Sequence, residues 1–204
     1  MAVNRTGLLI VFEGTDGTGK STQLQLLADT LQEQGFPVLS TREPTEGVYG
    51  RKIRELYTHR HTISQEEELD LFLADRKEHV EEILSPALEA GKIILCDRYY
   101  LSTIAYQGAA GLDPEYILAR NDFAPAPDLV LLFQAPIQTG IKRITQGRGE
   151  RLNDFEKEDY LRQVAIMFSQ IELPFIRRID AARSIEAIHC DVLNLVQPLL
   201  EKLQ

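Results

Sequence analysis

The chain has 204 residues, is 44% apolar and 26% charged, and carries a formal net charge of −9 at pH 7. This length and composition predict a globular protein with a single domain, residues 1–204. The acidic balance argues against basic nucleic-acid binders and against proteins that bind anionic membranes, so we expect neither nucleic acid nor a membrane as partner. Anionic ligands remain possible if arginines gather locally.

The two cysteines, Cys96 and Cys190, stand in apolar stretches without a CxxC or a metal-ligand spacing. This usage is typical of reduced core cysteines in a cytoplasmic protein. The apolar run near the N-terminus is too short for a signal peptide, and no stretch approaches the length of a membrane span. We therefore expect a cytoplasmic protein.

The first predicted elements alternate between strand and helix. An unbroken apolar run at residues 8–12 predicts a buried strand, and the helical pattern of 20–34 predicts the helix that follows it. A second strand is expected at 37–41. A longer helix is expected over 64–84, because its first residues are spaced as an S-x-x-E capping box.

Strands and helices go on alternating toward the C-terminus. A Gly/Arg-rich loop is expected at 147–153, and Asn153 with Glu156 is spaced to cap the helix after it. The alternation predicts a parallel sheet with helices on both faces, an α/β fold in which ligands gather at the carboxyl ends of the strands. The remaining predicted elements are strands at 92–96, 128–133 and 176–180 and helices at 136–145, 153–173 and from Ser184 onward.

The most informative motif is GTDGTGKS at 14–21, which fits G-x-x-x-x-G-K-[ST], the phosphate-binding P-loop. It lies between a predicted strand and a predicted helix N-terminus, where backbone N–H groups and the helix dipole form an anion site. Lys20 is expected to reach the β- and γ-phosphates of a nucleotide, and Ser21 to ligate Mg²⁺. The alternative is a glycine-rich turn with an incidental lysine. The residues expected to bind the nucleotide are Gly14, Thr15, Asp16, Gly17, Thr18, Gly19, Lys20, Ser21 and Thr22.

Two charged residues follow the predicted strand at 92–96. Asp97 directly ends the apolar run, the position of the Walker-B carboxylate that holds Mg²⁺ in P-loop proteins. Its alternative role is the N-cap of a helix beginning at Tyr99. Arg98 can fork onto two oxygens of a phosphate, and its alternative role is a surface ion pair.

Arg148 and Arg151 stand in the stretch GRGER at 147–151. Glycines beside arginines are typical of a hinged loop that can close over a site, neutralise transition-state charge and exclude water. The alternative is a solvated charged loop.

Phe72 and Arg76 are four residues apart on the predicted helix, so they share one face. They could form a base-binding pair, with the ring stacked on a pyrimidine and the guanidinium bonded to a ring carbonyl. They could equally be a core aromatic and an arginine that extends to solvent. Their spacing leaves both interpretations open.

These motifs together resemble the thymidylate kinase family. The resemblance implies the three-layer P-loop nucleoside-monophosphate kinase fold, with a five-stranded parallel sheet and a mobile lid at 147–153. It implies the reaction ATP + dTMP → ADP + dTDP with Mg²⁺ as cofactor, and a homodimer. The matching stretches, in family order, are FEGTDGTGKSTQ (12–23), TREP (41–44), LFLADR (71–76), DRYYLSTIAYQG (97–108), GRGER (147–151) and IDAARSIEAI (179–188).

The resemblance also implies roles for single residues. Asp16 would lie at the junction of the two substrates, near the acceptor phosphate and the metal. Phe72 would stack on thymine, Arg76 would bond the base, and Arg98 would hold the dTMP phosphate. The other residues implied at the dTMP site are Arg42, Glu43 and Pro44 near the base, and Thr103, Tyr106 and Gln107 in the nucleoside pocket, where the tyrosine crowds the place of a ribose 2′-hydroxyl.

The family has two positions for a catalytic arginine, one in the P-loop and one on the lid. Gly17 occupies the P-loop position here, so the chain resembles the bacterial type with a lid arginine. Arg148 is the first choice and Arg151 the second, because the transferring phosphoryl group needs a cation from elsewhere. The catalytic residues expected are Asp16, Lys20, Arg98, Arg148 and Arg151.

Two other functions share part of this pattern. A deoxynucleoside kinase would phosphorylate a 5′-hydroxyl and would need a carboxylate base, for which Glu43 is the obvious candidate. A P-loop switch would control a partner through its nucleotide state. The NKxD stretch of guanine-reading switches does not occur in this sequence.

Overall fold

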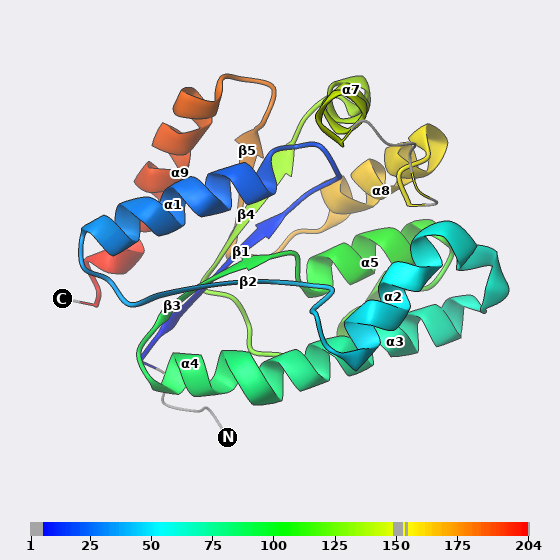
Figure 1. Cartoon of the computed structure of the whole chain (residues 1–204), viewed down its shortest axis with the longest axis horizontal. Coiled ribbons are helices and arrows are strands. Elements are labelled where there is room, and N and C mark those ends of the chain that lie inside the picture. Colours follow the sequence, from blue (N-terminus) through cyan, green and yellow to red (C-terminus); the bar gives the residue numbers. More distant parts are fainter. Residues whose placement is uncertain (1–5, 149–152, 154, 204) are drawn as a thin grey trace.

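The computed structural model of the chain describes residues 6–148, 153 and 155–203, and of residues 147 and 148 it describes the backbone alone. Strands and helices alternate along the chain (Figure 1). The strands are β1 (Leu8–Glu13), β2 (Val38–Arg42), β3 (Ile93–Asp97), β4 (Leu129–Gln134) and β5 (Ile176–Asp180). The α-helices are α1 (Lys20–Glu33), α2 (Val48–His59), α3 (Gln65–His79), α4 (Ser85–Glu89), α5 (Tyr100–Ala109), α6 (Pro114–Arg120), α7 (Ile137–Arg148), α8 (Glu158–Gln170) and α9 (Ile185–Leu200). A 3₁₀ turn, η1 (Arg60–Thr62), joins α2 to α3, and a π-helical turn, η2 (Val80–Leu84), joins α3 to α4.

The five strands form one parallel sheet in the order β2-β3-β1-β4-β5, which confirms the predicted α/β fold. The central strand β1 lies between β3 and β4, and Phe12 near its end is opposite Asp97 of β3. The carboxyl edge of the sheet therefore brings the loop after β1 beside the residues that follow β3. This edge is where ligands bind in open parallel sheets.

Two hydrophobic clusters cover the two faces of the sheet, because alternate residues of β1 point to opposite sides. Leu8, Ile10 and Phe12 pack in the cluster beneath α1 and α9. Leu9 and Val11 pack in a larger cluster with α3, α4, α5 and α8. Figure 1 shows these two helical layers on either side of the sheet. Among the described residues, no helix is both long and apolar enough to cross a membrane.

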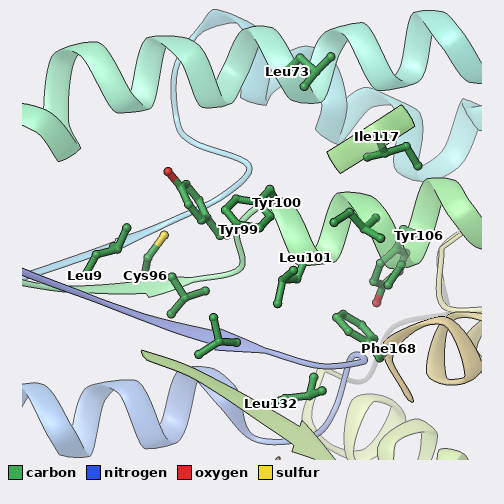
Figure 2. Close-up of a cluster of buried hydrophobic side chains, with 14 of the residues drawn as sticks. Leu9, Leu73, Cys96, Tyr99, Tyr100, Leu101, Tyr106, Ile117, Leu132 and Phe168 are labelled. Atoms are coloured by element: carbon green, nitrogen blue, oxygen red, sulfur yellow. The ribbon is translucent and has the colours of Figure 1, made fainter. Parts of the chain in front are cut away.

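The larger cluster holds helix α5 in place. Figure 2 shows Tyr99, Tyr100 and Leu101, at the start of α5, among its side chains, with Tyr106 beside Phe168 of α8. The rings of Tyr106 and Phe168 meet edge to face, with centroids 6.5 Å apart. Since α5 follows β3 directly, this packing fixes the orientation of the helix at the carboxyl edge of the sheet.

Several predicted boundaries are confirmed and others are wrong. Ser64 caps α3 as predicted, with both hydrogen bonds of the capping box to Glu67 formed. The N–H of Asn153 donates to Oε2 of Glu156 at 2.9 Å, but this pair closes a turn, and α8 begins only at residue 158. Helix α8 also ends at residue 170, because Ile171 is extended. Helix α7 continues to residue 148, past the predicted end at 145.

Helices α2 and α6 were not predicted from the sequence. Gly50 lies inside α2. A Cβ at Gly50 would lie 1.9 Å from the carbonyl oxygen of Thr45, so this glycine permits a close backbone approach. Cys96 is a buried free cysteine as expected, whereas Cys190 is exposed on α9 and not a core residue.

Candidate active site

The P-loop joins β1 to the N-terminus of α1. Gly14, Gly17 and Gly19 have φ angles of 134°, 76° and 89°, the left-handed side that favours glycine. A Cβ on Gly17 would lie 2.2 Å from the carbonyl oxygen of Gly140 in α7, so the loop touches α7 through two glycines. No side chain of the described residues caps α1, and its first turn carries no acid. Its N-terminal N–H groups therefore remain available to an anion.

Lys20 is buried at the first position of α1 and folds back on the P-loop. Its Nζ donates to the carbonyl oxygens of Gly14 at 3.0 Å and Thr15 at 2.9 Å. Burial, helped by the nearby Arg98 cation, lowers the pKa of Lys20 to about 8 although Asp16 and other acids oppose the shift. A phosphate that entered the loop would offer this ammonium group a stronger partner than the carbonyls.

Asp16 and Arg98 form an ion pair beside the P-loop. Nη2 of Arg98 donates to Oδ1 of Asp16 at 2.7 Å, and the hydroxyl of Tyr106 donates to Oδ2 at 2.9 Å. Burial alone would raise the pKa of Asp16, but the Arg98 and Lys20 cations outweigh it and hold this pKa at about 2. The side chain of Arg98 is 17% exposed, so this pair is not the surface ion pair considered as the alternative.

The turn that presents Arg98 is held by Glu13, a residue that the sequence analysis missed. Arg98 has a φ of 70°, a strained value for a residue with a Cβ. The carboxylate of Glu13 accepts hydrogen bonds from the N–H groups of Tyr99 at 2.8 Å and Ser102 at 3.0 Å, and from the Ser102 hydroxyl at 2.5 Å. Burial raises the pKa of Glu13 despite these bonds. The indication in the sequence was the position of Glu13, an acidic residue between the apolar run at 8–12 and the P-loop.

Ser21 and Asp97, the predicted Mg²⁺ ligands, contact each other. The hydroxyl of Ser21 donates to Oδ2 of Asp97 at 2.5 Å. Oδ1 of Asp97 is buried and has no hydrogen-bond partner among the described residues. The N-cap of α5 is Tyr99, so the capping role considered for Asp97 is wrong. A hydroxyl oxygen beside an unsatisfied carboxylate oxygen fits a magnesium ion, which prefers oxygen ligands.

A pocket lies between α3 and α5 at the carboxyl edge of the sheet. This edge is where open parallel sheets bind their ligands. Arg42 does not line this pocket. Its side chain is exposed and lines a wider cleft beside the pocket. The predicted dTMP-site residues that line the pocket are Asp16, Glu43, Pro44, Phe72, Arg76, Arg98, Thr103, Tyr106 and Gln107.

Arg76 is buried in the wall of this pocket and does not extend to solvent. Its side chain is 1% exposed and donates to Glu43 at 2.6 Å, to Asn121 at 2.7 Å and to Thr103 at 3.0 Å. His79 approaches the second oxygen of Glu43 at 3.0 Å. Nε of Arg76 has no hydrogen-bond partner among the described residues. The interpretation of Arg76 as a snorkelling arginine is therefore wrong.

A wider cleft opens beside the pocket, over the P-loop. Asp16 and Arg98 line both spaces, so the pocket and the cleft meet at this ion pair. Thr15 and Thr18 are P-loop residues with buried side chains, and the Thr18 hydroxyl donates to the Thr15 carbonyl at 2.8 Å. The predicted residues that line the cleft are Asp16, Gly17, Gly19, Lys20, Ser21, Thr22, Arg42, Glu43, Pro44, Asp97 and Arg98.

The structure adds cleft residues that the sequence analysis missed. Arg54 and Tyr57 come from α2, which was not predicted, and Arg143 comes from α7. Arg143 donates to the carbonyl oxygen of Ala181 at 3.0 Å and so joins α7 to the loop after β5. A single arginine within a helix does not by itself indicate a ligand site in the sequence.

The predicted lid arginines cannot be placed in the site. Arg148 is the last residue of α7, and its side chain lies outside the described structure. Arg151 lies outside the described residues altogether, as does most of the predicted lid.

Comparison with known proteins gives one consistent family. A family model described as thymidylate kinase matches residues 12–192. The thymidylate kinase of Desulfotalea psychrophila is 54% identical over 97% of this chain and 98% of its own length. A thymidylate kinase of Xanthomonas campestris pv. campestris is 45% identical over 89% of this chain and 79% of its own length. A probable thymidylate kinase of Pyrococcus abyssi is 43% identical, over 94% and 96%.

Proposed function

The chain belongs to the thymidylate kinase family, and we propose that it transfers the γ-phosphoryl group of ATP to dTMP, giving dTDP and ADP. It is a nucleoside-monophosphate kinase, a phosphotransferase with ATP as donor. We further propose that residues 1–204 act as one catalytic domain and that the segment 147–153 is its lid.

The observation that carries the proposal is the shared wall formed by Asp16 and Arg98. These two residues line both the pocket between α3 and α5 and the cleft over the P-loop. A phosphate monoester in the pocket would place its phosphate at this wall, directly facing the γ-phosphate of a nucleotide held by the P-loop. Transfer between two bound phosphates requires such an arrangement.

The pocket offers the groups that a thymine nucleotide needs. Phe72 lies on the pocket wall, where its ring can stack on the base, and Arg76, whose Nε has no hydrogen-bond partner among the described residues, lines the same pocket. The hydroxyl of Tyr106 donates to Oδ2 of Asp16 at 2.9 Å, and this bond would hold the ring where we propose that it crowds a ribose 2′-hydroxyl. These contacts support a pyrimidine deoxynucleotide as acceptor.

The acceptor itself needs no general base. A phosphate monoester has a second pKa near ~6, so it is largely dianionic at pH 7 and already nucleophilic. The difficulty is to bring two polyanions together, and Lys20 and Arg98 supply cations at the meeting point. The Asp16 partner can hold Arg98 in position until the acceptor phosphate arrives.

Ser21 and Asp97 would hold Mg²⁺. The buried, unpartnered Oδ1 of Asp97 and the hydroxyl of Ser21 beside it supply two oxygen ligands. A bound Mg²⁺ ion would neutralise charge on the β- and γ-phosphates.

The lid would supply the remaining cation. We assign this role first to Arg148 and second to Arg151, since Gly17 leaves the P-loop without an arginine. Closure of residues 147–153 over the cleft would also exclude water that could otherwise accept the phosphoryl group.

The deoxynucleoside kinase alternative loses its catalytic base in this structure. Both carboxylate oxygens of Glu43 are engaged, one by Arg76 at 2.6 Å and the other by His79 at 3.0 Å. Neither oxygen of this carboxylate is therefore free to take a proton from a 5′-hydroxyl. The switch alternative is not favoured by the family match.

The decisive experiment measures ADP release with Mg-ATP and, in turn, dTMP, dUMP, UMP, CMP, AMP and thymidine. We expect turnover of dTMP to exceed that of the other acceptors. Turnover of thymidine without dTMP would restore the deoxynucleoside kinase, and acceptor-independent ATP hydrolysis would restore the switch.

We also propose a homodimer in the cytoplasm. Large apolar side chains lie exposed near α3 and α6, among them Ile83, Leu118 and Phe123 with 42%, 41% and 38% of their surface accessible. Burial of such groups against a second copy would stabilise a dimer. Light scattering on the purified protein tests this, and a monomer at all concentrations would contradict it. The two free cysteines agree with a reducing compartment.

A further inference from the structure

The side-chain amide of Gln107 is held from one side only. Gln107 is 1% exposed, lines the nucleoside pocket, and its Nε2 donates to Oε1 of Glu68 at 2.8 Å. Its Oε1 is buried and has no hydrogen-bond partner among the described residues. A buried, unpartnered acceptor in a ligand pocket is costly unless a ligand donates to it.

The orientation of this amide follows from the chemistry of Glu68. A carboxylate accepts hydrogen bonds and cannot donate them, so the nitrogen of Gln107 must face Glu68 and the oxygen must face away. Arg60 forks onto the Glu68 carboxylate, with Nε donating to Oε2 at 2.6 Å and Nη2 donating to Oε1 at 2.7 Å. The side chain of Glu68 is only 4% exposed, so solvent screens the pair weakly.

Arg60 is itself held by two aromatic residues, Phe155 and Tyr160. Its guanidinium lies 4.3 Å from the ring centre of Phe155 and 4.5 Å from that of Tyr160, and its Nη2 donates to the Tyr160 hydroxyl at 2.7 Å. That hydroxyl donates to the carbonyl oxygen of Tyr106, the residue before Gln107. Arg60 is therefore linked to Gln107 in two ways. It binds Glu68, which accepts from the Gln107 side chain, and it binds Tyr160, whose hydroxyl donates to the backbone of the preceding residue.

We propose that Glu68, held by Arg60, is a positioning residue that selects the base by turning the Gln107 oxygen toward the pocket. The proposal rests on the proposed function, because it deepens the substrate choice of the same site. An acceptor oxygen binds the N3–H of thymine or uracil. It repels the N3 of cytosine, which carries a lone pair and no hydrogen. Glu68 thus favours pyrimidines protonated at N3 without touching the base.

The test is the isosteric substitution Glu68→Gln. Its amide can donate to the Gln107 oxygen, so the Gln107 amide can turn and present its NH₂ group to the pocket. We expect the ratio of kcat/KM for dTMP to kcat/KM for dCMP to fall by ~10-fold or more, mainly through KM for dTMP. Glu66→Gln, the same change at an exposed position of α3, is the matched control and should leave the ratio unchanged.

A double variant separates positioning from a general structural role. In a Gln107→Ala background there is no amide to turn, so Glu68→Gln should have no further effect on the ratio. An unchanged ratio in Glu68→Gln alone, or an equal fall in both backgrounds, would overturn the proposal.

A second substitution guards against a folding defect in Glu68→Gln. Glu68→Asp remains an acceptor only, so it should keep the ratio within ~3-fold of the parent even if it lowers stability. A ratio that falls as far in Glu68→Asp as in Glu68→Gln would also overturn the proposal. Loss of dTMP turnover in the parent protein would instead contradict the proposed function.

Discussion

The two halves of the site are built differently. In the nucleoside pocket, Arg76 is fully buried and bonded to Glu43, Asn121 and Thr103, so its position is set before any ligand binds. In the cleft, which is wider, Lys20 is bonded to backbone carbonyls of its own loop. Under the proposed function, the pocket would be a preformed wall for the base, whereas the cleft would exchange internal contacts for phosphates. Substrate specificity would then depend on the pocket, and charge neutralisation on the cleft.

The largest effect should come from the cleft. Lys20→Met removes a buried cation from the phosphate site, and we expect kcat to fall by ~10³-fold, because a donor to developing charge is lost. The Kd for dTMP, measured by calorimetry, should change little, since the pocket does not depend on Lys20. A parallel loss of dTMP affinity would contradict the division between the two halves.

The next effect is on the stability of the pocket wall. Arg76→Met leaves the buried carboxylate of Glu43 without its guanidinium partner, and we expect the free energy of unfolding to fall by about 3 kcal/mol. Urea denaturation measures this. The double variant Arg76→Met, Glu43→Gln removes the stranded charge and should be more stable than the single one. If the double variant is less stable, the cost arises from packing and not from the unpaired charge.

A smaller loss is expected on the lid. Arg148→Ala should lower kcat by ~10²-fold with little change in the Kd for dTMP, because the arginine is required only when charge develops during transfer. Arg151→Ala is the paired control and should have the weaker effect. A normal kcat in Arg148→Ala together with a slow Arg151→Ala would transfer the role to Arg151.

The smallest effect concerns pH. The pKa of Lys20 in the free protein is lowered to about 8, so its charge is lost as pH rises through that value. ATP affinity should weaken by ~10-fold between pH 7 and 9, because the charged fraction of Lys20 falls by about that factor over this range. Lys20→Arg stays charged and should show a flat profile. Since the fold holds this proton less tightly than the unfolded chain does, the contribution of Lys20 to the free energy of unfolding rises between pH 8 and its ordinary pKa of 10.5.

Patterns of neighbouring residues predicted the sheet and the P-loop, whereas residues that act through long-range contacts were not predicted. The apolar runs and the P-loop stretch located the sheet and the phosphate end, because each depends on neighbouring residues only. Glu13, Glu68 and Asn121 were not singled out, although all three are buried. Their partners lie 86, 39 and 45 positions away in the sequence, so no local pattern marks them. The predicted start of α8 at Asn153 is wrong for a similar reason. The local capping pattern does not show where tertiary packing lets the helix begin, which is residue 158.

The contact between Gly17 and Gly140 limits how such enzymes can diverge. A side chain at 17 would meet the backbone of α7 at 2.2 Å, and a Cβ at 140 would meet the carbonyl oxygen of Asp16 at 2.7 Å. An arginine placed at position 17 therefore cannot be accommodated by rotating a side chain, because the backbone of the P-loop or of α7 must shift. The absence of a side chain at both positions is what lets the phosphate loop and α7 lie in direct backbone contact.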